Sequence, residues 1–269
     1  MIEINAARAI NPIPNGNTRP YYVTCNDGNT YAVKFGQNPE GYRVLVNEFV
    51  CAEIAKELEL PLAEPAIIIA GKEFISDFGD EISNHIYSTV QEGRHFGSSK
   101  VRKATQITSA GMISQARNIH VIPELVIFDQ FVCNVDRDRN MGNLLFDISK
   151  KEIVVIDHTH AFEIGAMWDA TQLRMRIGQP FEMFDTNGYV YKKLVQFVDG
   201  NNPFHTILTK LSGMTDERLW HIINSVPAQW GVNDEEKHVL HEYLIDRRNR
   251  IEQVLPLLRQ YLPRWKGGS

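Results

Sequence analysis

Three oxygen-bearing side chains are spaced along the middle of the chain in a way that suits a metal ion beside a phosphate. Asp138 and Asn143 lie in the charged stretch NVDRDRNMGN, and Asp157 ends the apolar segment KEIVVID. Magnesium prefers hard oxygen ligands and keeps several waters, so a few protein oxygens together with substrate phosphates make an adequate site. We therefore expect Asn143 and Asp157 to ligate Mg²⁺.

Asp138 is the candidate catalytic base of this stretch. The stretch directly follows the apolar segment PELVIFDQFV and precedes KEIVVID, so two ordered elements would hold it in place. A carboxylate fixed there could orient or deprotonate an attacking hydroxyl without an unusual pKa. Asp136 is the alternative base. Arg137 and Arg139 could neutralise phosphate, and a structural pairing is an equally good interpretation.

A lysine and a glutamate further upstream complete the set that phosphoryl transfer requires. Lys34 lies in YAVKF, on the second strand of an expected hairpin, in a VAIK-like setting. Glu48 lies near the start of the next expected helix, on which Glu53 is the alternative partner. Gly28 is the one glycine of the hairpin segment TCNDGNTYAVKF, and we expect it to lie near the nucleotide phosphates. This order of residues predicts an ATP- and magnesium-dependent kinase.

Two of these segments resemble those of HipA-like kinases, which are related to the phosphatidylinositol-kinase-like fold. DRNMGNLLF resembles the DRxxxN catalytic loop of that fold. VNEFVCAEIAKELELPLAEPAII resembles the segment in which a glutamate-bearing helix runs into a strand. The similarity extends from about Tyr21 to Leu262 and fits the compact branch that contains only the kinase domain. It implies a two-lobed kinase fold that uses ATP and Mg²⁺.

The resemblance also implies a role for each candidate residue. Asp138 takes the place of the catalytic base, and Asn143 and Asp157 take the places of the magnesium ligands. Lys34 takes the place of the lysine that contacts the α- and β-phosphates, paired with Glu48. The chain departs from related kinases in having no GxGxxG motif, so we expect backbone amides to cover the phosphates with fewer glycines.

The segment DHTH offers two readings of the histidines that follow the candidate metal ligand. His158 and His160 could bind a metal, but no further ligand-type residue stands at a matching spacing. We therefore expect His158 to take the place of the phenylalanine of the kinase DFG motif.

The first part of the chain predicts strands around one helix. PYYVTC and TYAVKF flank NDGN, whose composition is typical of a hairpin turn. Apolar residues at helical spacing predict a helix over residues 44–60, which Pro61 ends. AEPAIIIA and HIYSTV predict two further strands, with AGKEFISDFGDEISN as an irregular connection between them.

The second part predicts mostly helices. PELVIFDQFVCNV is apolar nearly all round and has Pro123 in a first-turn position, which indicates a buried helix. KEIVVID predicts a strand. A long helix begins at a capping box formed by Asn233 and Glu236, and Pro256 is expected to kink or split it.

These elements predict an α+β fold of the two-lobed protein-kinase-like type. We expect a small β-rich N-terminal lobe with one helix at residues 1–90. Residues 91–122, polar and rich in glycine and serine, would form a linker and the start of the second lobe. A larger, mostly helical C-terminal lobe would occupy residues 123–265.

Composition narrows the classes of partner and environment. The chain has 269 residues, is 43% hydrophobic and carries a formal net charge of -5, so it can bury a large core and has no overall attraction for nucleic acid or an anionic membrane. Cys25, Cys51 and Cys133 are too far apart to suggest a zinc site or a disulfide framework. We expect a cytoplasmic protein without a signal peptide or membrane span.

The acceptor of the phosphate is the least constrained part of this prediction. The resemblance favours a serine or threonine hydroxyl of a protein substrate and leaves room for a cognate regulator. A small-molecule or lipid kinase would use the same site residues. A pseudokinase or interaction module would hold nucleotide without turnover, and the intact set of Lys, Asp, Asn and Asp argues against it.

Overall fold

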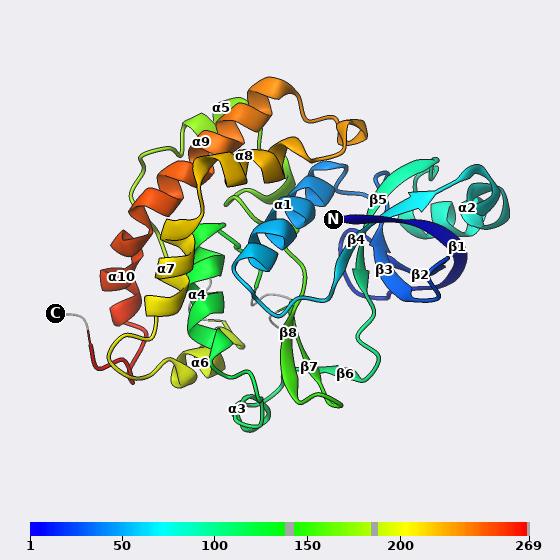
Figure 1. Cartoon of the computed structure of the whole chain (residues 1–269). Coiled ribbons are helices and arrows are strands. Elements are labelled where there is room, and N and C mark those ends of the chain that lie inside the picture. Colours follow the sequence, from blue (N-terminus) through cyan, green and yellow to red (C-terminus); the bar gives the residue numbers. More distant parts are fainter. Residues whose placement is uncertain (138–142, 184–187, 268–269) are drawn as a thin grey trace.

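The computed structural model describes residues 1–137, 143–183 and 188–267. It has an α+β fold, with a β-rich N-terminal part and a mostly helical C-terminal part, as the sequence predicts (Figure 1). The N-terminal part is a closed barrel with the strand order β1-β2-β3-β5-β4. Its strands are β1 (Ile2–Pro12), β2 (Tyr21–Cys25), β3 (Thr30–Lys34), β4 (Pro65–Ala70) and β5 (Gly93–Ser99).

The expected hairpin is confirmed as the antiparallel pair β2–β3, which runs from Thr24 opposite Thr30 to Tyr21 opposite Val33. The sequence did not predict β1, which closes the barrel by pairing antiparallel with β2 and parallel with β4. Most of β1 is solvent-exposed, Ile10 among its residues, so its apolar residues do not alternate as those of a half-buried strand do.

The segment between β4 and β5 is helical, which corrects two expectations. Helix α2 (Lys72–Ile86) occupies the stretch expected to be irregular and takes in the first two residues of HIYSTV, so the strand expected there is wrong. Phe74, Ile82 and Ile86 recur at helical spacing and are buried against the barrel. Tyr87 ends the helix in a left-handed conformation.

The first residues of the expected linker belong to the barrel. Strand β5 is hydrogen-bonded to β3 on one side and to β4 on the other. Gly97 allows this fit, because a Cβ at that position would lie only 2.6 Å from Cγ1 of Ile68. The polar composition of RHFGSS therefore reflects a closely packed strand rather than a linker, and residues 91–99 do not separate two parts of the chain.

Helix α1 (Arg43–Glu57) confirms the helix expected after the hairpin and lies between the barrel and the other helices (Figure 1). A small antiparallel sheet, in the order β6-β7-β8, lies below it in that view. Its strands are β6 (Ala104–Gln106), β7 (Leu144–Asp147) and β8 (Glu152–Val155). The remaining α-helices are α3 (Ala110–Ile113), α4 (Val121–Phe131), α5 (Ala170–Arg174), α6 (Tyr191–Leu194), α7 (His205–Gly213), α8 (Asp216–Asn224), α9 (Asp234–Arg250) and α10 (Leu255–Arg259).

Two sequence signals in the helical part are confirmed in detail. Asn233 and Glu236 form the predicted capping box at the start of α9. The long helix is split, as predicted, since α9 ends at Arg250 and α10 begins after a short 3₁₀ turn with Pro256 in its first turn.

The buried apolar residues form two separate cores. One lies within the barrel and includes residues of α2. The other joins the helices of the C-terminal part and also takes in the apolar residues of α1, such as Val46 and Phe49. Helix α1 is therefore packed with the helical part, although it lies between two barrel strands in the sequence. Within the described ranges, none of the helices combines the length and apolar character needed to cross a bilayer.

Candidate active site

Lys34 is a buried cation held by two carboxylates. It is the last residue of β3 and lies opposite Phe96 of β5. Its Nζ pairs with Glu48 Oε1 and lies 2.9 Å from Asp157 Oδ1. Burial alone would lower the pKa of Lys34, but Asp157 and Glu48 outweigh it and raise the pKa above its ordinary value. The lysine is therefore a fixed positive charge.

Glu48 connects strand β3, which carries Lys34, to the segment after β8. Its Oε2 accepts a hydrogen bond from the backbone N–H of His158 at 3.1 Å. Thr159 donates its hydroxyl to Glu48 Oε1 at 3.1 Å and accepts from Lys34 Nζ at 2.6 Å. The alternative partner Glu53 lies elsewhere, 3.4 Å from the amino group of Met1. The structure therefore pairs Lys34 with Glu48, as the sequence predicts.

Asn143 and Asp157 are brought to the same end of the small sheet. The β7–β8 ladder pairs Leu144 with Val155, and the backbone N–H of Ile156 donates to the carbonyl of Asn143 at 3.1 Å. Both residues have left-handed backbones, with φ of 41° at Asn143 and 59° at Asp157. Residues other than glycine rarely adopt this conformation, and such residues cluster at functional sites.

The chemistry of this pair fits a magnesium ion. Asp157 Oδ1 is engaged by Lys34 and by the backbone N–H of Thr159 at 3.2 Å, whereas Oδ2 has no hydrogen bond to a described residue. Burial raises the pKa of Asp157, but Lys34 and the Thr159 hydrogen bonds lower it further, so the side chain is a carboxylate. An ionised carboxylate and an amide oxygen are hard ligands of the kind that Mg²⁺ takes.

The start of the charged stretch, at residues 134–137, is anchored by a fully buried arginine. Arg137 donates through Nε to Asp129 Oδ2 at 2.9 Å and through Nη2 to Asp129 Oδ1 at 2.8 Å. Its Nη1 donates to the carbonyls of Asn143 at 3.1 Å and Ile156 at 2.7 Å. Arg137 therefore ties α4 to the ends of β7 and β8, which settles its role among the described residues as structural.

Of the two candidate bases, Asp136 is among the described residues and Asp138 is not. Asp138 and Arg139 lie outside the described residues. Asp136 lies 3.4 Å from Nδ1 of His160, whose Nε2 lies 3.5 Å from Glu40. Asp136, followed by Glu40, raises the pKa of His160 to about 10, so this imidazole is charged at neutral pH.

The sequence model of the HipA-like kinases matches residues 6–260, which is nearly the whole chain. This chain belongs to the HipA-like kinase family. The geometry agrees with that class, because a lysine, a helix glutamate and a strand-terminal aspartate meet in one buried cluster. A comparison with curated proteins finds no significant match.

A comparison with solved structures finds other kinases. A proinflammatory kinase of Helicobacter pylori, CtkA, is similar over 96% of this chain and 98% of its own, with 14% identity and a TM-score of 0.58. At that identity the likeness shows the fold alone. A Golgi casein kinase has 10% identity over 97% of this chain and 75% of its own, with a TM-score of 0.43. Its structure with Mn/ADP bound has 10% identity over 93% and 72%, with a TM-score of 0.39.

Gly28 is not brought to the lysine cluster of this HipA-like kinase. It lies in the turn that joins β2 and β3, where its N–H donates to the carbonyl of Cys25 at 3.0 Å. Lys34 is at the other end of β3. The strand alone spans about 13 Å from Thr30 to Lys34 at the usual rise per residue. The connection between β1 and β2, residues 13–20, is at the lysine end, because Tyr21 pairs with Val33.

His158 has a packing role. His158 is buried edge-on against Phe128, with ring centroids 5.6 Å apart, which agrees with its expected place in the DFG-like motif. The described residues contain no group of three or more His, Cys, Asp or Glu suited to a metal, so the alternative reading of DHTH gains no support there.

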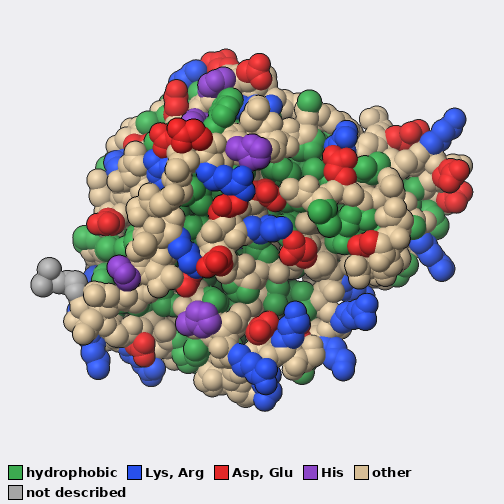
Figure 2. Space-filling model, viewed as in Figure 1, with side chains coloured by type: hydrophobic (Ala, Val, Ile, Leu, Met, Phe, Trp, Pro, Cys, Tyr) green, Lys and Arg blue, Asp and Glu red, His purple; other side chains and the backbone are tan. Residues whose placement is uncertain are grey.

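Acidic and basic side chains are interspersed across the face of the molecule in Figure 2.

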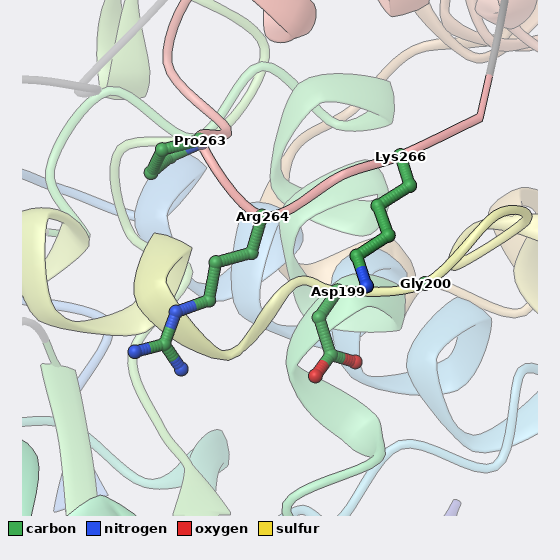
Figure 3. A pocket seen from close by; sticks show the side chains of 5 residues that line it. All are labelled: Asp199, Gly200, Pro263, Arg264 and Lys266. Carbon is green, nitrogen blue, oxygen red and sulfur yellow. The ribbon is translucent and has the colours of Figure 1, made fainter.

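Two cavities differ in their relation to this cluster. One of about 440 Å³ lies near the C-terminus, where Arg264, Lys266 and Asp199 line it (Figure 3). None of its residues belongs to the lysine cluster. The other is lined by Glu48 and Asp157, among others, but its volume of about 10 Å³ has room for no more than about one water.

Some residues of the site have no marker in the sequence. Thr159, Asn47 and Asp129 are buried and connect segments that are far apart in the chain. Thr159 stands two residues after a recognisable aspartate, which is a weak signal. Asn47 precedes the helix glutamate, and Asp129 is a charge within the apolar segment PELVIFDQFV. A carboxylate in such a segment indicates a buried partner, but it does not identify Arg137.

Proposed function

We propose that this HipA-like kinase is ATP- and magnesium-dependent and transfers the γ-phosphate to a serine or threonine hydroxyl of a protein. In this proposal the barrel and the helical part act as two lobes with the nucleotide between them. The observation that carries it is the buried Lys34 with its two carboxylates, Glu48 and Asp157. Kinases use such a lysine to hold the nucleotide phosphates and such an aspartate to hold the metal.

Each residue of the cluster has a role in this proposal. Lys34 contacts the α- and β-phosphates, and Glu48 together with Thr159 fixes the direction of its amine. Asn143 and Asp157 hold the magnesium, which neutralises negative charge on the phosphates when bound. In this proposal the connection between β1 and β2 covers the phosphates, and the pairing of Tyr21 with Val33, next to Lys34, supports it.

The transfer step needs only a base and correct alignment. The acceptor oxygen forms a bond to the γ-phosphorus while the bond from that phosphorus to the β–γ bridging oxygen breaks, so that ADP leaves. Asp138 receives the proton of the acceptor hydroxyl. Arg137 holds the start of this segment against α4 and the small sheet.

The acceptor and the setting rest on the family rather than on the site. A protein hydroxyl is the acceptor that membership of the HipA-like kinases favours, and a cognate regulator belongs to the same expectation. The formal net charge of -5 supports a partner other than nucleic acid or an anionic membrane. We also propose a cytoplasmic location, because Cys25, Cys51 and Cys133 are free thiols.

Nucleotide binding can be tested by thermal stability. Binding to the folded state alone stabilises it by about 2.7 kcal/mol when ATP is at a hundredfold excess over its dissociation constant. We expect ATP to raise the melting temperature when magnesium is present and to raise it much less with EDTA. Lys34→Met should remove most of the shift. Lys56→Met is the matched control, since Lys56 pairs with Glu64 on the surface.

A wild-type protein that shows no shift with ATP and magnesium would contradict the proposal.

The acceptor class needs a separate experiment. Transfer of labelled γ-phosphate in a lysate, followed by identification of the labelled molecule, distinguishes the acceptor classes. A labelled protein carrying phosphoserine or phosphothreonine supports the proposed acceptor. A labelled lipid or small molecule would overturn that part while leaving the kinase assignment in place.

A further inference from the structure

Asn47 is a completely buried amide that connects α1 to the segment following the candidate metal ligand. Its Nδ2 donates to the carbonyl of Thr159 at 2.7 Å and to the carbonyl of Gly165 at 3.1 Å. Its Oδ1 accepts a hydrogen bond from the indole N–H of Trp168 at 2.7 Å. A single side chain thus satisfies two carbonyls and one donor within residues 159–168, and it has no exposed surface.

We propose that Asn47 is a positioning residue for the Lys34–Glu48 pair, an inference that rests on the proposed use of that pair to hold nucleotide. Asn47 immediately precedes Glu48 on α1. Successive residues of a helix are related by a fixed rotation and a rise of 1.5 Å, so holding Asn47 also fixes the direction from which Glu48 reaches the lysine. Asn47 touches neither Lys34 nor any group expected to react.

The segment that Asn47 holds also carries the other contacts of the lysine cluster. Thr159, whose carbonyl accepts from Asn47, uses its hydroxyl to bridge Lys34 and Glu48. Asp157 lies two residues before it and gives the lysine its second carboxylate. Asn47 therefore helps to place both carboxylates. It places Glu48 through helix α1, and Asp157 through the segment that contains Thr159.

A second contact near the start of α1 holds the helix in the same place. Arg43 pairs with Glu236 of α9, and its guanidinium lies 4.3 Å from the ring centre of Trp168. Trp168 thus contacts α1 at two points, through Arg43 and through Asn47. Together with the apolar residues of α1, which pack into the helical core, these contacts hold the glutamate helix against the helical part.

The test compares Asn47→Asp with a matched asparagine elsewhere. Asn47→Asp keeps the size of the side chain but turns a carboxylate oxygen toward two carbonyls, so both donated hydrogen bonds are lost. Asn118→Asp is the control, because Asn118 also donates to a backbone carbonyl and accepts from a backbone N–H, both of Ile153, at 2.9 Å each. Trp168→Phe is a milder second variant, which removes the bond to Oδ1 and leaves a smaller aromatic ring beside Arg43.

The decisive measurement is the affinity for magnesium-ATP in a double-mutant cycle with Glu48→Gln. We expect Asn47→Asp to weaken binding about tenfold in the wild-type background and about threefold or less in the Glu48→Gln background, because most of its effect passes through Glu48 and only the remainder through the segment that carries Asp157. Trp168→Phe should follow the same pattern with a smaller factor, and Asn118→Asp should change affinity less than twofold in both. An equal loss in both backgrounds for Asn47→Asp and Trp168→Phe would overturn the inference.

A readout without nucleotide separates this inference from the proposed function. Cys51 lies one turn after Asn47 on α1 and is buried, while Cys25 is buried in the barrel. In Asn47→Asp, iodoacetamide should alkylate Cys51 at least about tenfold faster relative to Cys25, because α1 loosens while the barrel stays folded. An unchanged Cys51-to-Cys25 ratio would overturn the inference even if the wild type binds nucleotide. A wild type that binds no nucleotide contradicts the proposed function, and the alkylation ratio then still decides whether Asn47 holds the helix.

Discussion

Two buried ion-pair clusters, Arg137 with Asp129 and Lys34 with Glu48 and Asp157, differ in how their charges are matched. Arg137 and Asp129 are a pair of one cation and one anion, each at most 1% exposed. Tyr191 donates a further hydrogen bond to Asp129 at 2.8 Å, and the arginine also satisfies two backbone carbonyls. Every charge in this cluster has its partner within the protein.

The lysine cluster is matched differently. Lys34 faces two carboxylates, Glu48 and Asp157, so the group carries one more negative charge than positive. Asp157 keeps 31% of its side chain exposed and has an oxygen without a hydrogen bond to a described residue. A buried ion pair that is balanced internally is costly to break, whereas an excess carboxylate with an open side can accept a cation and its phosphates.

The largest expected effect separates activity from stability at Asp157. Asp157→Asn should reduce magnesium-dependent turnover by about a thousandfold or more, because a neutral amide is a poor ligand and cannot offset the metal charge. The free energy of unfolding should change by no more than about 1 kcal/mol, since Lys34 keeps Glu48 as its partner. Turnover and urea unfolding measure the two effects. Unchanged magnesium dependence would show that this carboxylate is not a ligand.

The opposite result is expected for the balanced cluster. Asp129→Asn should lower the free energy of unfolding by about 3–5 kcal/mol, because it leaves the Arg137 charge buried without a partner. Asp216→Asn is the control, since Asp216 forms an ion pair with Arg248 at the surface and should cost less than about 1 kcal/mol. If Asp129→Asn unfolds at the same urea concentration as the wild type, the Arg137 pair does not stabilise this segment.

The sequence predicted the first contacts of the lysine cluster better than the rest of it. Lys34 and Glu48 are on consecutive elements of a recognisable pattern, and the β7–β8 ladder carries Asn143 and Asp157 to one end. The pairs that brace the site join residues far apart in the chain, such as Arg137 with Asp129 and Asn47 with Trp168. Spacing alone cannot identify such partners, because it describes only one element at a time.

The fold shows the same limit at two elements. Helix α2 had a readable signal in Phe74, Phe78, Ile82 and Ile86, which recur every four residues, but its charged and polar residues suggested an irregular connection. Strand β1 had no such signal, because closure of the barrel rather than burial of one face makes it a strand. The turn that contains Gly28 was correctly predicted. Its separation from Lys34 follows from the direction of β3, which starts at this turn and ends at Lys34.

A smaller effect is expected for the two candidate bases. Asp138→Asn should retain ATP binding, because Lys34 and the metal ligands remain, and should lose turnover by about a hundredfold or more. Asp136→Asn should act mainly on stability, by about 1.5–3 kcal/mol, through the loss of charged contacts such as the ion pair with His160. Turnover and nucleotide-induced thermal shift measure both. Normal turnover in Asp138→Asn with a folded but inactive Asp136→Asn would assign the base to Asp136.

The smallest effect concerns the pH dependence of the contact between Glu40, His160 and Asp136. The raised pKa of about 10 means that protonated His160 stabilises the fold fully below its unfolded pKa of about 6.5. This contribution is lost as the pH rises through about 10. His160→Gln should therefore cost about 1 kcal/mol at pH 6 and almost nothing above pH 10. Urea unfolding at both pH values checks this, and an equal cost at both would exclude a charged histidine.

The central claim is that the buried lysine cluster serves transfer of phosphate from ATP. The most direct measurement is the transfer of labelled γ-phosphate from ATP by the purified wild type and by Asp157→Asn, each with magnesium and with EDTA, in a lysate that supplies acceptors. We predict label on serine or threonine of protein only for the wild type with magnesium. Equal labelling by the two proteins, or labelling that persists in EDTA, would contradict the account.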